Sequence, residues 1–81
     1  MTAQQLEHLA DGLSVSACGQ TLVVDRTRVR RAASGHNVSF TIAGTDLAPR
    51  VHLAHNRLAA ASWEEMSVLL RHLVTRVACG R

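Results

Sequence analysis

Residues 62–80 of the chain read SWEEMSVLLRHLVTRVACG, and their apolar side chains recur every three or four positions. This spacing is that of one face of an amphipathic α-helix. Ser62 followed by Glu65 forms a capping-box pattern that marks the beginning of the helix, and Gly80 marks its end. Arg76, near the end, complements the helix dipole. The sequence therefore predicts a C-terminal helix whose apolar face is buried against another layer.

The layer against this helix is predicted by segments in which apolar and polar residues alternate. Residues 38–42 have the period of a half-buried strand. Residues 13–26 have the pattern of a β-hairpin that turns at residues 18–20. Short turns between such segments indicate an antiparallel sheet with one face covered by the helix.

Two further segments complete the expected fold. Thr2 and Gln5 form a capping box that begins a short helix over residues 3–11. Residues 50–61 fit either a second hairpin or a helix, and the hairpin is favoured. We expect a single α+β domain over residues 1–81, with an antiparallel sheet of three to five strands packed by the C-terminal amphipathic helix and a short N-terminal helix.

Length and composition restrict the class of protein. The chain has 81 residues, enough for one domain and too few for two. No apolar run approaches the roughly 20 residues of a membrane span, and no secretory signal is visible. We therefore expect a cytoplasmic location and no membrane partner. In that compartment Cys18 and Cys79 would stay reduced and act as small buried hydrophobic residues.

Positive charge is concentrated in the middle of the chain. The net charge is +3, and residues 25–57 carry six of the arginines and only two aspartates. If the second strand continues through residues 25–31, alternate arginines emerge from one face about 6.5–7 Å apart. Such a stripe suits acidic groups, although charge on a strand also protects it from edge-to-edge pairing. The predicted partner-binding residues are Arg26, Arg28, Arg30, Arg31, Arg50 and Arg57.

Metal and catalytic chemistry have little support in the sequence. His52 and His55 are three positions apart, without the second closely spaced pair that zinc sites show, so no metal and no cofactor are predicted. Ser34-Gly35-His36 lies in an expected turn and has no orienting carboxylate assigned to it. We therefore predict that the protein is not an enzyme.

These features favour a small protein-binding module that engages an acidic surface through its arginine-rich strand, as an inhibitor or accessory factor. As a type, small α+β chains with a basic patch resemble phage-encoded inhibitors, anti-CRISPR proteins among them; this resemblance rests on size and on the lack of motifs and transfers no residues. The alternative is a DNA- or RNA-binding regulator that uses the same patch. The chain offers few aromatic rings for stacking on bases, which favours a protein partner. A homodimer is compatible with either function.

Overall fold

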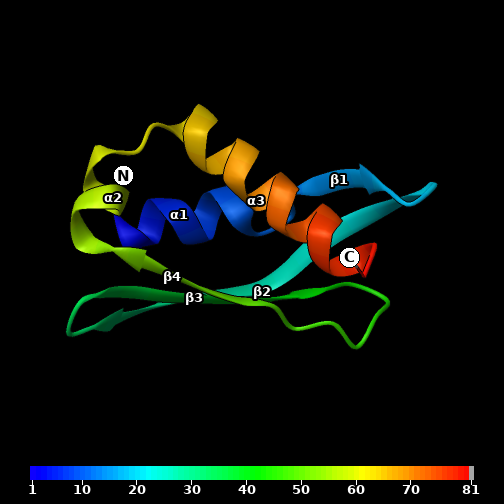
Figure 1. The fold of residues 1–81 in the computed structure, drawn as a ribbon, viewed down its shortest axis with the longest axis horizontal. Helices are drawn as coiled ribbons and strands as arrows, with labels where there is room; N and C mark the ends of the chain where they lie inside the picture. The colour runs from blue at the N-terminus through cyan, green and yellow to red at the C-terminus, as the bar shows by residue number, and fades with distance from the viewer. Residues whose placement is uncertain (81) are drawn as a thin grey trace.

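The computed structural model describes residues 1–80 and shows an α+β fold with a four-stranded antiparallel sheet (Figure 1). The strands lie in the sheet in chain order, β1-β2-β3-β4. The elements are α1 (Ala3–Ala10), β1 (Ser14–Ala17), β2 (Gln20–Ala32), β3 (Gly35–Ile42), β4 (Arg50–Ala54), α2 (His55–Ala60) and α3 (Trp63–Ala78). In Figure 1, α1 and α3 both lie above the sheet formed by β2, β3 and β4, and no helix of residues 1–80 lies below it. The predicted fold class is confirmed.

The core lies between this sheet and the helices. Val38, Phe40 and Ile42 of β3 are buried on the helix side, as their alternation predicts. From the opposite layer α3 buries Met66, Leu70 and Val74, while α1 buries Leu6 and Ala10. Both predicted helix starts are present: the Thr2 hydroxyl accepts from the amide of Gln5, and the Ser62 hydroxyl accepts from the amide of Glu65.

Residues 50–61 contain a strand followed by a short helix. The favoured hairpin is therefore wrong after Ala54, and the helix alternative is wrong before it. The change has a physical reason: Ala54 pairs with Gly35, the first residue of β3, so the ladder that supports β4 ends there. Beyond that point the chain gains more by burying Leu58 against the core, which a helical turn achieves.

The strand β4 approaches β3 closely at the same place. A Cβ atom on Gly35 would collide with the backbone carbonyl of Leu53. A glycine is therefore required at the start of β3, where the backbones of the two strands are in contact.

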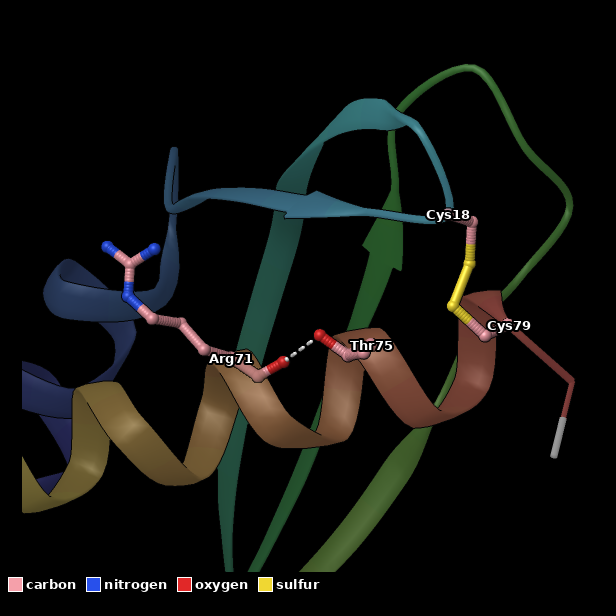
Figure 2. Close-up of a disulfide and its surroundings, with 4 residues drawn as sticks. All are labelled: Cys18, Arg71, Thr75 and Cys79. Atoms are coloured by element: carbon pink, nitrogen blue, oxygen red, sulfur yellow. Dashed lines mark hydrogen bonds between the residues drawn. A yellow bond between two sulfur atoms is a disulfide. The ribbon is translucent and has the colours of Figure 1, made fainter.

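A disulfide joins Cys18 to Cys79, so the prediction of two reduced, buried thiols is wrong. Both residues are exposed, and their Cα atoms lie 5.9 Å apart despite a sequence separation of 61. Figure 2 shows that Cys18 follows β1 and that Cys79 caps the end of α3, which runs beside that strand. Because disulfides persist mainly in oxidising compartments, the state of the cysteines no longer supports a cytoplasmic location.

A second contact fastens α3 to the other end of β1. The guanidinium of Arg71 donates a 2.7 Å hydrogen bond to the carbonyl oxygen of Ser14, and its side chain points toward that end of the strand in Figure 2. The helix and the edge strand are thus held together at two points.

Among residues 1–80, no helix combines the length and the apolar character needed to cross a membrane.

Candidate anion-binding face

One extra residue in β2 decides which way its arginines point. Asp25 lies opposite Thr41, but the next pair is Arg28 opposite Ser39, so β2 advances three residues while β3 advances two. Arg26 sits in this β-bulge with a φ of 52°, in the left-handed region. Before the bulge Leu22 and Val24 are buried on the helix side.

After the bulge the alternation of β2 is reversed. Val29 now lies opposite Val38, which is buried on the helix side, whereas Arg28 and Arg30 are exposed on the opposite face. Without the extra residue, strict alternation would place both arginines on the side of Leu22. The prediction that Arg26, Arg28 and Arg30 share one stripe therefore needs a correction: Arg28 and Arg30 share a face, and Arg26 lies in the bulge outside the regular alternation.

Carboxylates hold the bulge in place. The amide of Arg26 donates to the Asp25 side chain at 2.8 Å, and that of Val29 donates to Glu7 of α1, also at 2.8 Å. Asp11, one helical turn after Glu7, accepts from the amide of Thr27 at 3.3 Å. These bonds satisfy backbone donors on the edge of β2 that faces away from β3.

Two rows of polar side chains cross the uncovered side of the sheet. In the first row Arg28, Ser39 and Arg50 lie opposite one another on β2, β3 and β4. The second row lies two residues further along each strand and consists of Arg30, Asn37 and His52. Directly opposite side chains in such rows have Cβ atoms about 4.5–5.5 Å apart. We call this surface the outer sheet face, and its residues are Arg28, Arg30, Asn37, Ser39, Arg50 and His52.

The outer sheet face contains a shallow hollow of about 550 Å³. None of the residues around it is acidic. Two arginines from strands on either side of β3 contribute to it, and the half-buried Ser39 lies between those strands. The residues that line the hollow are Arg30, Asn37, Val38, Ser39, Arg50, Val51 and His52.

His52 is held by hydrogen bonds on both sides of its ring. Its Nδ1 lies 2.8 Å from Oδ1 of Asn37, and its Nε2 lies 3.2 Å from Oγ of Ser34. Because an amide oxygen only accepts, Nδ1 carries a proton and donates it to Asn37. Ser34 therefore contacts the ring of His52, which the amide of Asn37 orients. The sequence pattern suggests only the neighbouring His36, with an orienting carboxylate. All three side chains are exposed: Ser34 lies in the turn between β2 and β3, Asn37 on β3 and His52 on β4.

The remaining predicted arginines lie elsewhere. Arg31 is opposite His36, whose other cross-strand partner is the buried Leu53, so it belongs to the alternation of the helix side. Arg57 is exposed on α2. Of the six predicted positions, the structure thus brings together Arg28, Arg30 and Arg50 on the outer sheet face.

The histidines near α2 pack against each other. The rings of His36 and His55 meet edge to face with their centroids 5.1 Å apart. Within residues 1–80 no group of three or more potential metal ligands is found.

Comparisons of the chain with protein-family models, with curated proteins and with solved structures found no match. The outer sheet face is therefore interpreted from its own geometry.

Proposed function

We propose that the protein is a non-catalytic binding module whose outer sheet face docks on an acidic surface of a partner protein. The observation that carries the proposal is the projection of Arg28 and Arg30 from β2 and of Arg50 from β4, on either side of β3, on the side of the sheet that no helix of residues 1–80 covers. A flat surface of one sign of charge attracts a partner of the opposite sign and fixes its orientation.

The side chains on this face favour a protein over a nucleic acid. An arginine guanidinium binds a carboxylate through two parallel hydrogen bonds, which suits aspartate and glutamate side chains. Recognition of single-stranded nucleic acid relies on aromatic rings that stack on bases. Phe40 is buried on the helix side of the sheet and Trp63 begins α3, so neither ring belongs to the outer sheet face.

Docking on this face would act on the partner by occlusion. The protein would cover an acidic surface and hold it away from other molecules, as an inhibitor or an accessory factor does. DNA or RNA binding is the competing outcome of the test described next.

The experiment compares two double charge reversals with the same change in net charge. Arg28→Glu with Arg50→Glu alters the outer sheet face, while the control, Arg31→Glu with Arg57→Glu, alters arginines away from it. Tagged forms of the protein and its variants capture partners from lysates of the native cells, and cross-linking identifies which residues of the tagged protein contact the captured partner.

Loss of an acidic protein partner in the first variant, retention in the control, and cross-links to β2–β4 would support the proposal. Equal capture by both variants would refute it. Capture of nucleic acid alone, sensitive to nuclease, would replace it with the DNA- or RNA-binding alternative. Light scattering on the same samples shows whether the protein binds as a homodimer.

A cytoplasmic location is a separate proposal. It predicts that Cys18 and Cys79 are found as thiols when native cells are treated with an alkylating reagent before lysis. Recovery of the Cys18–Cys79 disulfide under those conditions would argue for an oxidising compartment instead.

A further inference from the structure

Several hydrogen-bond donors line the hollow in the outer sheet face, beside Val38 and Val51. Arg30 of β2 and Arg50 of β4 contribute guanidinium groups from the two strands that flank β3. Ser39 is the direct neighbour of Arg50 on β3, and its hydroxyl can donate a further hydrogen bond. No acidic residue lines the hollow, so an anion placed there would meet no like charge from its walls.

The hydrogen bond from His52 determines what Asn37 can offer. Oδ1 of Asn37 accepts from Nδ1 of His52 at 2.8 Å, which fixes which end of the amide is the NH₂, and this NH₂ is a donor for a ligand. Asn37 also lies directly opposite Arg30 and lines the same hollow. His52 therefore fixes the orientation of the Asn37 amide, whose NH₂ adds to the donors of the hollow.

We propose that this hollow is a phosphate-binding subsite that takes a phosphorylated side chain of the partner protein. The proposal rests on the function proposed above and specifies the group that the outer sheet face recognises. It follows from the number and placement of the donors. A carboxylate has two oxygens in one plane, and a single arginine fork satisfies both.

A phosphate monoester makes fuller use of the hollow. It presents three terminal oxygens and a charge of about −1.5 to −2 at neutral pH. Two guanidinium groups from opposite sides, with a hydroxyl and an amide NH₂ from the strand between them, match a tetrahedral group with several acceptors. A phosphodiester has one charge and two free oxygens, so it would leave donors of this set unused.

The test titrates ¹⁵N-labelled protein, at 150 mM salt, with three acidic peptides that differ only at one central residue, which is phosphoserine, glutamate or serine. We expect the phosphoserine peptide to bind at least about tenfold more tightly than the glutamate peptide, a difference of about 1.4 kcal/mol. We also expect amide shifts centred on residues 37–39 and 50–52.

Two variants of the outer sheet face test whether the preference for phosphoserine arises in the hollow. Arg30→Gln and Ser39→Ala should each reduce the preference for phosphoserine over glutamate to less than about threefold, because each removes donors from the hollow. Arg57→Gln, on α2, removes the same charge as the first variant and should leave the preference unchanged. Circular dichroism confirms that each variant is folded.

The outcomes separate the two proposals. Equal binding of the phosphoserine and glutamate peptides would overturn the phosphate subsite while leaving docking on an acidic protein intact. A phosphoserine preference that survives in Arg30→Gln would also overturn it. Failure of all three peptides to bind would overturn the subsite, and the charge-reversal capture experiment would then decide the proposed function by itself. Tighter binding of duplex DNA than of the phosphoserine peptide at the same salt would replace the protein partner with a nucleic acid.

Discussion

Breaking the Cys18–Cys79 disulfide should remove at least a third of the free energy that stabilises the folded protein. The bond closes a loop with a sequence separation of 61. The chain-entropy relation for a loop of this length gives a stabilisation of about 4 kcal/mol at 25 °C, since the bond limits the unfolded chain. A domain of 81 residues has a free energy of unfolding on the order of 4–12 kcal/mol. The reduced protein is therefore expected to keep about 0–8 kcal/mol of that free energy.

The exposure of both cysteines makes this effect measurable without a packing artefact. Because Cys18 and Cys79 are both exposed, replacing each with serine leaves no cavity in the core. Urea unfolding of the oxidised protein, of the same protein under a reductant, and of the Cys18→Ser/Cys79→Ser variant should show one large decrease, shared by the last two samples. With a urea m-value of about 1–2 kcal/mol/M, the midpoint should fall by about 2–4 M.

Two results would contradict this reasoning. A decrease of less than about 1 kcal/mol would mean that residual structure in the unfolded chain already restricts it nearly as much as the bond does. A decrease in the double-serine variant but none under reductant would assign the effect to the substituted side chains and not to the cross-link. Hydrogen exchange on the reduced protein should show the largest loss of protection in β1 and at the end of α3, which the bond joins.

Further substitutions test three local features: the hydrogen bond from β2 to Glu7, the close approach of β4 to β3, and the N-cap of α3. Glu7→Ala should lower the free energy of unfolding by about 1.5–3 kcal/mol in urea titrations, because the amide of Val29 loses its carboxylate partner; an unchanged value would show that the bond does not support the bulge. Gly35→Ala should cost about 2–3 kcal/mol by forcing β4 away from β3, whereas Gly44→Ala, which meets no neighbouring atom and is strained only by its φ of +80°, should cost about 1 kcal/mol; similar losses at both sites would refute the close approach. Ser62→Ala should lower thermal stability by about 1 kcal/mol through the loss of the α3 cap, and Ser62→Asp should retain it.

The local patterns of the sequence predict most of the elements because each pattern has its cause within a few residues. The apolar spacing of α3, its Ser62 cap and the alternation around Phe40 are all of this kind. The change from strand to helix at Ala54 is different, because it depends on β3 ending at Gly35 on the neighbouring strand. Nothing in the sequence pattern of residues 50–61 indicates where the pairing between β3 and β4 ends.

The candidate site shows the same division between local and distant causes. The pairing of Arg28 with Arg30 on one face follows from their spacing and is confirmed. The backbone after the bulge at Arg26 donates hydrogen bonds to Glu7 of α1 and to Asp11 at its C-cap, and the place of Arg50 beside Ser39 depends on the register of β4. The disulfide likewise requires α3 to lie along β1. These relations join distant parts of the chain, so they could not be derived from spacing alone.

The bulge in β2 also separates the buried positions of this long strand from the arginines that it exposes on the outer sheet face. Before the bulge, Leu22 and Val24 at even-numbered positions are buried, and after it Thr27 and Val29 at odd-numbered positions are half-buried. A change of charge at Arg28 or Arg30 therefore alters what the molecule presents to its surroundings without disturbing the hydrophobic contacts of Leu22. The exposed residues of this strand can thus be substituted without altering its buried positions, provided that the inserted residue and the carboxylates of Glu7 and Asp11 are kept.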